Sequence, residues 1–132
     1  MAQMRFQMNE DIQEKFQQQI EILEKYKWEK GGLMIHPPKS QEELANESVV
    51  LHHTVVCYLG KISDGKTAIL FIRKVTEPDK PFYTLELNPK TLAVVQCRTD
   101  HNASYEKQPE IMGFVETWLK EVVHNDKREK TT

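Results

Sequence analysis

Three short apolar segments separated by turn residues constrain the fold of this chain most strongly. We expect strands over residues 67–75, 82–87 and 92–98, which are rich in Ile, Leu, Val and Phe. The connections 77–81 and 88–90 contain the Pro, Asp and Asn residues that are typical of turns. Because connections this short join neighbouring antiparallel strands, the pattern predicts a three-stranded antiparallel β-meander.

A long amphipathic helix is predicted before the strands, over residues 9–30. Its apolar residues recur at helical spacing, and its other face is rich in Gln, Glu and Lys. Gly31-Gly32 is expected to end the helix, and Leu33–His36 to form a short extended piece closed by Pro37-Pro38. The apolar stripe predicts that the helix packs on the domain, with contact to a partner as the alternative.

Further helices are predicted in the centre and at the end of the chain. Ser40 and Glu43 form a capping box that begins a short helix reaching about Asn46. Apolar residues at helical spacing over 50–62 predict a second central helix, although the valines there leave a strand as the alternative. Pro109 suits the first turn of a last helix. The predicted fold class is α+β, with a three-stranded antiparallel β-meander packed against N-terminal, central and C-terminal helices.

Both cysteines of the chain lie four residues from a histidine, as His53 with Cys57 and as Cys97 with His101. In a helix or in a strand, the first pair points to one side of its element. Two such pairs predict a tetrahedral, structural zinc site made by His53, Cys57, Cys97 and His101. His52 is an alternative to His53 as a ligand. Ordinary buried cysteines are the alternative to the metal site.

Strand alternation gives two finer expectations. It places Ala93, Val95 and Cys97 on one face of the third strand, so that Cys97 ends an apolar row which the central helix could meet. It also favours a cross-strand ion pair between Arg73 and Glu86, which lie on adjacent predicted strands.

Composition bounds the class of protein. The chain has 132 residues, of which 39% are hydrophobic and 29% charged, so we expect one soluble domain. This domain is predicted over 33–124, with the helical segment 1–32 packed on it and a charged tail over 125–132. The net charge of −2 argues against a protein that coats nucleic acid. No apolar segment approaches the roughly 20 residues that cross a bilayer, and no signal-peptide core is visible. We therefore expect a cytoplasmic protein of a bacterial host with reduced cysteines.

A series of short motifs lies in a characteristic order over roughly residues 33–123. They are Ile35–Ser40, Glu43-Leu44, Leu51-His52-His53, Tyr58, Gly65, Ile69–Arg73, Pro78, Pro81, Thr84-Leu85-Glu86, Val95–Arg98 and Asn102. In this order they resemble the PcfJ-like family, whose members are encoded on conjugative plasmids, phages and other mobile elements. Two positions depart from the family pattern. Thr54 stands at a family cysteine, with Cys57 three residues later, and Thr99 stands at a family glycine.

The resemblance implies a function on a mobile element. The module stands almost alone here, as in small inhibitors of host defence, and the chain looks like a zinc-containing anti-CRISPR protein. The implied function is that of an inhibitor which binds a type II CRISPR effector nuclease and blocks target-DNA loading or cleavage. Zinc would be structural, and a monomer is favoured.

Two other classes of function remain as alternatives. A nucleic-acid-associated accessory module of conjugation or phage replication could use Arg73, Lys74, Arg98 and Lys107 as a basic patch, although acidic residues are interspersed with them. An enzyme is not expected, because no oxyanion motif or phosphate-binding glycine loop accompanies the cysteines, the histidines or Glu86.

Overall fold

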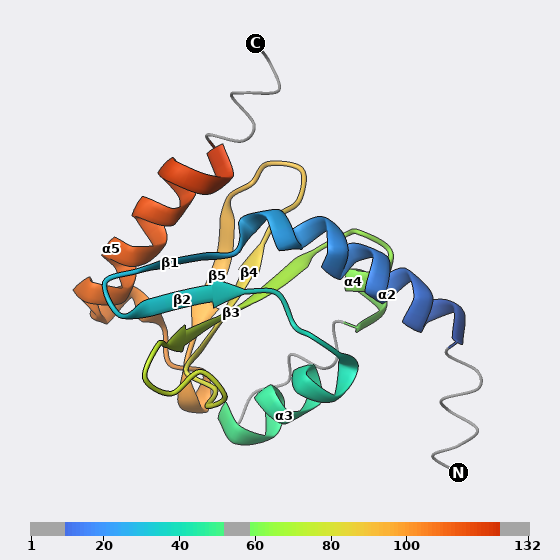
Figure 1. The fold of residues 1–132 in the computed structure, drawn as a ribbon, viewed down its shortest axis with the longest axis horizontal. Helices are drawn as coiled ribbons and strands as arrows, with labels where there is room; N and C mark the ends of the chain where they lie inside the picture. The colour runs from blue at the N-terminus through green and yellow to red at the C-terminus, as the bar shows by residue number, and fades with distance from the viewer. Residues whose placement is uncertain (1–9, 52–58, 125–132) are drawn as a thin grey trace.

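The computed structural model describes residues 10–51 and 59–124. Its centre is a five-stranded antiparallel sheet in the order β1-β2-β3-β4-β5, in which every strand pairs with its neighbours in sequence (Figure 1). The α+β class is confirmed, and each of the three predicted strands is present to within two residues. The predicted size of the sheet is wrong, because two further strands precede them. The strands are β1 (Trp28–Lys30), β2 (Leu33–His36), β3 (Ala68–Lys74), β4 (Tyr83–Leu87) and β5 (Val94–Arg98).

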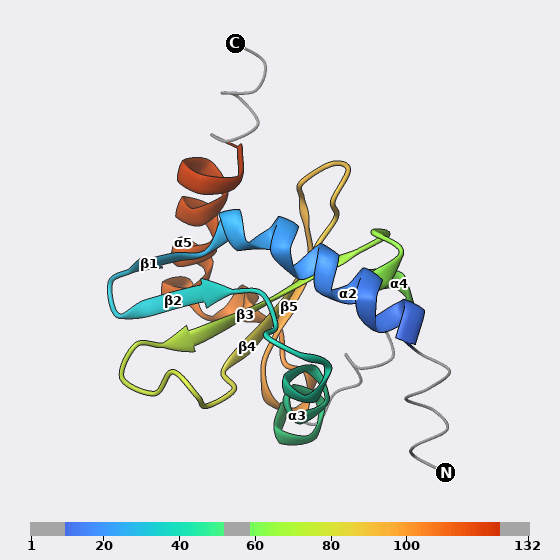
Figure 2. The ribbon, with the colours of Figure 1, turned by 45° about the vertical axis from the view of Figure 1, so that its right-hand side comes forward.

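Helices cover both faces of this sheet (Figures 1 and 2). On one face lie α2 (Glu10–Leu23), α3 (Gln41–Leu51) and α4 (Leu59–Ser63). On the other face lies α5 (Pro109–Trp118), which continues as a π-helical turn, η5 (Leu119–Val123). Short 3₁₀ turns complete the described chain, namely η1 (Glu24–Tyr26), η3 (Asp100–Asn102) and η4 (Tyr105–Lys107).

The first helix is shorter than the sequence predicts, and its expected last turn is strand β1. Gly31 and Gly32 have φ values of +61° and +86°. Two successive positive φ values are those of a tight hairpin turn, so the glycines join two strands and do not end a helix. The indole ring of Trp28 packs on Phe114 at a centroid distance of 5.3 Å, which buries part of β1 against α5.

The central helices also differ from the prediction. The helix that begins at the Ser40 cap runs to Leu51, beyond the break expected near Asn46. The second central helix is described only from Leu59 to Ser63. The stretch 52–58 lies outside the described residues, so the choice between helix and strand there stays a prediction.

Alternation along β3 divides the core into two clusters. Ala68, Leu70 and Ile72 face α5, whereas Ile69 and Phe71 face the side of α2, α3 and α4. All five are at most 3% exposed, and burial of each large apolar side chain contributes about 1.5–3 kcal/mol. β3 is therefore the strand on which both layers of helices are assembled.

A register shift in β5 overturns the predicted apolar row. Leu87 lies opposite Val94 while Glu86 lies opposite Gln96, so Val95 is an extra residue in the strand. Val95 is 57% exposed, whereas Val94 and Cys97 pack in the cluster on the α5 side. Strict alternation is wrong here because a bulged residue shifts the facing of the residues on one side of it.

Candidate functional site

A charged residue in the middle of an apolar strand is the centre of the polar site. Arg73 follows Ile69 and Phe71 on the same face of β3, yet it is only 1% exposed. Its guanidinium group lies 4.6 Å from the centroid of the Phe71 ring. A buried guanidinium stays charged, so it needs an anionic partner within reach.

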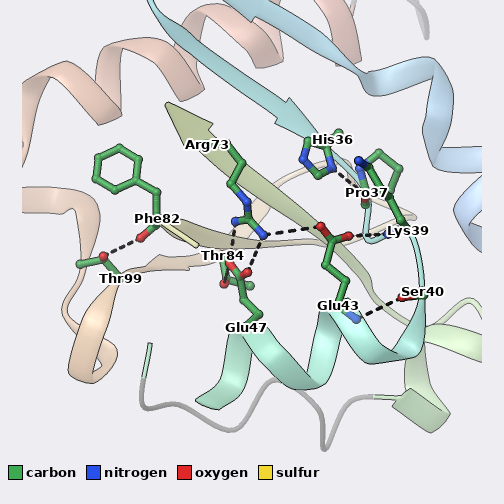
Figure 3. Close-up of polar contacts among 10 residues, drawn as sticks. All are labelled: His36, Pro37, Lys39, Ser40, Glu43, Glu47, Arg73, Phe82, Thr84 and Thr99. Atoms are coloured by element: carbon green, nitrogen blue, oxygen red, sulfur yellow. Dashed lines mark hydrogen bonds and ion pairs between the residues drawn. The ribbon is translucent and has the colours of Figure 1, made fainter. Parts of the chain in front are cut away.

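That partner is Glu47 of α3 (Figure 3). The Arg73 Nη1 and Nη2 atoms donate to the two carboxylate oxygens of Glu47 at 3.0 and 2.7 Å. Thr84 Oγ1 of β4 donates to the same carboxylate at 2.8 Å. The expected cross-strand pair of Arg73 with Glu86 is wrong, because Glu86 lies opposite Ile69, four residues away along β3.

The start of α3 joins this network. Glu43 N donates to Ser40 Oγ at 3.1 Å, so the Ser40 cap is confirmed. The carboxylate half of the predicted capping box differs, because Glu43 Oε1 accepts from Lys39 N at 2.6 Å, one residue before the cap. The other carboxylate oxygen of Glu43 lies 3.8 Å from Arg73 Nη2. The Arg73 Nε atom has no hydrogen-bond partner within the described residues.

The physical effect of this network is to fasten α3 to the sheet. Glu47 is fully buried, and burial raises the pKa of its carboxyl even though Arg73 and Thr84 lower it. Leu44 of α3 also joins the apolar cluster on this side. The ion pair and Leu44 together attach α3 to the sheet. Because both charged groups of the pair are buried, ligands do not reach them.

A second polar row crosses the same face of the sheet toward β5. Glu86 accepts hydrogen bonds from Thr67 Oγ1 at 2.6 Å and from Gln96 Nε2 at 3.0 Å. Gln96 Oε1 in turn accepts from Arg98 Nε at 2.9 Å. The side chains of this row are bonded to one another, which indicates a role in holding β3, β4 and β5 in register.

Arg73 and Lys74, two members of the basic patch considered from the sequence, do not share one surface. Arg73 and Lys74 are adjacent in a strand and point to opposite faces. Arg73 is buried against Glu47, whereas Lys74 Nζ lies 4.9 Å from the centroid of the Phe82 ring. A phosphate backbone could not contact both residues from one surface.

The two described members of the predicted zinc site lie in different surroundings. Cys97 is 1% exposed in the apolar cluster on the α5 side, and burial raises the pKa of its thiol to about 12. His101 has a side chain that is 74% exposed and lies 3.0 Å from Asp100. The structure thus places Cys97 in the apolar core and His101 at the surface.

His53 and Cys57 lie outside the described residues, so the structure does not test the four-ligand set as a whole. Within residues 10–51 and 59–124, no three His, Cys, Asp or Glu side chains are grouped to hold a metal ion. α3, whose end leads directly to His52 and His53, contacts the η3 turn that carries His101.

Sequence reasoning missed two residues of the polar site. An arginine inside an apolar strand requires a buried acid, but Glu47 lies just beyond Asn46, where the predicted short helix ends, so its place on one helix face with Glu43 was not expected. His36 ends the predicted extended piece and is the last residue of β2, as expected, but its burial to 6% exposure was not foreseen.

The edge of the sheet at β5 carries a groove of about 300 Å³. β5 pairs with β4 on one side, and on its other side the described residues provide only a single bridge, between Arg98 and Ser104. The groove is lined by Val94, Val95 and Gln96 of the strand and by Ser104, Tyr105 and Met112 beyond it. An apolar side chain, Val95, thus lies at an open strand edge.

Comparison with known proteins identifies the family. The model of the family described as PcfJ-like protein matches residues 2–112, which is most of the chain. The chain therefore belongs to the PcfJ-like family. No curated protein and no solved structure matched it. Among the described residues, no helix has the length and apolar character needed to cross a membrane.

The family match and the geometry coincide on one face of the sheet. Ser40, Glu43, Arg73, Thr84 and Glu86 belong to the motifs quoted from the sequence, and all five take part in the two polar networks. These motif residues thus serve the attachment of α3 and the register of the sheet.

Proposed function

We propose that this chain is a binding protein that docks on a protein partner through the open edge of β5. The observation that carries the proposal is the difference between the two edges of the sheet. The β1 edge exposes Glu29 and Lys30, charged residues of the kind that keep an edge strand from pairing with other chains. The β5 edge exposes Val95, which is 57% accessible beside a groove.

The mode of binding would be the addition of a strand. An extended segment of the partner would lie along the outer edge of β5 at Val94 and Val95, and its side chains would enter the groove beside Tyr105 and Met112. The bulge at Val95 turns this apolar side chain outward, where a partner can cover it. Arg73 and Glu86 are hydrogen-bonded to other residues of the fold, so these polar groups serve the structure itself. This favours binding at the outer surface over a function of the polar interior.

The partner proposed first is a type II CRISPR effector nuclease. This choice rests on membership of the PcfJ-like family, whose proteins are encoded on mobile elements that encounter host defence. Binding would obstruct the loading of target DNA or the movement that precedes cleavage. A structural zinc held by His53, Cys57, Cys97 and His101 stays part of this proposal, supported by the contact between α3 and η3.

The docking surface is tested with matched variants of two exposed valines. Val95→Lys places a charge on the β5 edge, and Val75→Lys places one at a valine that is 36% exposed after β3. In a binding assay with purified type II nucleases, Val95→Lys should weaken binding at least about tenfold, as expected for a contact residue at the centre of an interface. Val75→Lys should bind like the wild type. Equal binding by both variants would refute the β5 edge, and no binding by the wild type would refute the partner.

The zinc site is tested separately by elemental mass spectrometry of tag-free protein. About one zinc per chain is expected, with loss of the metal in Cys57→Ser and in Cys97→Ser and retention in His52→Ala. Full zinc in Cys97→Ser would show that the ligand set is wrong without affecting the proposal for the β5 edge.

A further inference from the structure

A second pocket, of about 390 Å³, lies at the opposite side of the sheet from β5. It opens over β1 and β2, between the η1 turn, the segment that follows β2 and the loop that follows β3. Its apolar lining includes Met34, Ile35, Pro37 and Pro78. This volume is in the range of pockets that hold small ligands or single side chains.

A buried histidine, His36, is among the residues that line this pocket. His36 Nδ1 lies 2.8 Å from the carbonyl oxygen of Pro37, and since a carbonyl can only accept, Nδ1 carries the proton. Nε2 of the neutral ring is then an acceptor. It has no hydrogen-bond partner among the described residues, although His36 is only 6% exposed and lines the pocket. Burial keeps the ring neutral, because it lowers the pKa of His36.

The rim of the pocket carries an excess of negative charge. Glu24, Glu29 and Asp79 supply carboxylates, and Lys27 and Lys39 supply ammonium groups. Lys27 is paired with Glu24 at 3.2 Å. Glu29 and Asp79 have no ion-pair partner in the described part of the chain, so two free carboxylates remain against the one ammonium group of Lys39.

We propose that this pocket binds the guanidinium group of an arginine side chain presented by another molecule. The aliphatic stem of arginine would cover Met34 and Pro78, as such stems cover apolar surfaces elsewhere. One N–H of the guanidinium group would donate to His36 Nε2. Glu29 and Asp79 would balance its charge, and its several donors let it meet these groups together. The site is independent of the docking surface at β5.

The test titrates the full chain with N-acetyl-arginine N-methylamide and follows the His36 ring and Met34 methyl signals by NMR. Saturable shifts of these signals are expected. The neutral citrulline analogue, which has nearly the same shape, should bind at least about fivefold more weakly, because only the charged group meets the carboxylates. Equal affinity for the two compounds, or no saturable shift, would overturn the proposal.

Matched variants locate the contacts. The double variant Glu29→Gln/Asp79→Asn should weaken binding about tenfold, since two exposed charge contacts are removed. Glu14→Gln on the exposed face of α2 removes one carboxylate elsewhere and should bind like the wild type. Lys39→Gln should strengthen binding, which a purely structural role of the rim would not predict. Unchanged binding in both the double variant and Lys39→Gln would assign the shifts to another surface.

Discussion

Removal of one partner from the buried pair between Arg73 and Glu47 should be the most damaging single change to this fold. Glu47→Leu leaves a guanidinium group that is 1% exposed facing an apolar side chain. Breaking such a pair typically costs about 3–5 kcal/mol, because the remaining charge is buried without compensation. The whole free energy of unfolding of a domain is about 5–15 kcal/mol, so this variant should lose a large fraction of its stability.

The double variant Glu47→Leu/Arg73→Met should recover most of that loss. It replaces the pair by apolar side chains of similar volume, a change that is often neutral or stabilising by about 1–4 kcal/mol. The coupling energy between the two positions should therefore be at least about 3 kcal/mol. Comparable cycles on exposed pairs give about 0.2–1 kcal/mol, so the exposed pair Lys27–Glu24 is the matched control.

Urea denaturation followed by tryptophan fluorescence measures these energies. Trp118 is fully buried and its Nε1 atom donates to Tyr26 O at 2.8 Å, so its emission reports loss of the core. With a slope of about 1–3 kcal/mol per molar urea, a loss of 4 kcal/mol moves the midpoint by roughly 1.3–4 M. A cost below about 1 kcal/mol for Glu47→Leu, or a coupling no larger than that of the exposed pair, would refute the role assigned to the ion pair.

Three further predictions concern pH, thiol reactivity and the hairpin. Burial lowers the pKa of His36 below 6.5, so at acidic pH the unfolded chain binds a proton at this imidazole more readily than the folded chain does. The free energy of unfolding should therefore fall as the pH drops below 6.5. Urea midpoints measured at pH 7.5 and 5.5 should differ less in His36→Gln than in the wild type. In zinc-free Cys57→Ser protein, Cys97 should react with a thiol reagent only as fast as the core opens, and rapid labelling would show that the thiol is exposed. The free energy of unfolding should also fall above pH 9, because the pKa of the Cys97 thiol is about 12 in the folded chain and 9.0 in the unfolded chain. Gly32→Ala should cost about 1 kcal/mol or more at a φ of +86°, whereas Gly31→Asn should be nearly neutral at +61°, as thermal melting would show.

The parts of the fold that follow from local pattern could be predicted. The strands at 67–75 and 82–87, the Ser40 cap and the helix from Pro109 each depend on residues close together in sequence. The hairpin of β1 and β2 could not be separated from the helix before it, because Trp28–Lys30 continues the helical pattern. Its strand identity depends on pairing with β2 and on packing against α5, which are contacts distant in sequence.

The candidate site was harder to predict from the sequence than the fold. The sequence pattern predicts a partner for Arg73 on β4, because strand alternation indicates only which residues of adjacent strands are neighbours. The actual partner, Glu47, comes from a helix packed on top of the sheet, and only the tertiary structure brings it within 2.7 Å. The facing of Val95 was missed because a bulge depends on the register of two strands and not on one.

The two proposed binding surfaces occupy opposite sides of one sheet, and this separation makes each a control for the other. β2 and β5 are three strand spacings apart, or about 14 Å at about 4.8 Å per spacing. Substitutions that far apart without shared partners act independently. Val95→Lys should therefore leave the affinity for the arginine compound unchanged, and Glu29→Gln/Asp79→Asn should leave the binding of the nuclease unchanged. If Val95→Lys weakened both, the variant would have disturbed the sheet itself, and its effect on the nuclease would not locate an interface at the β5 edge.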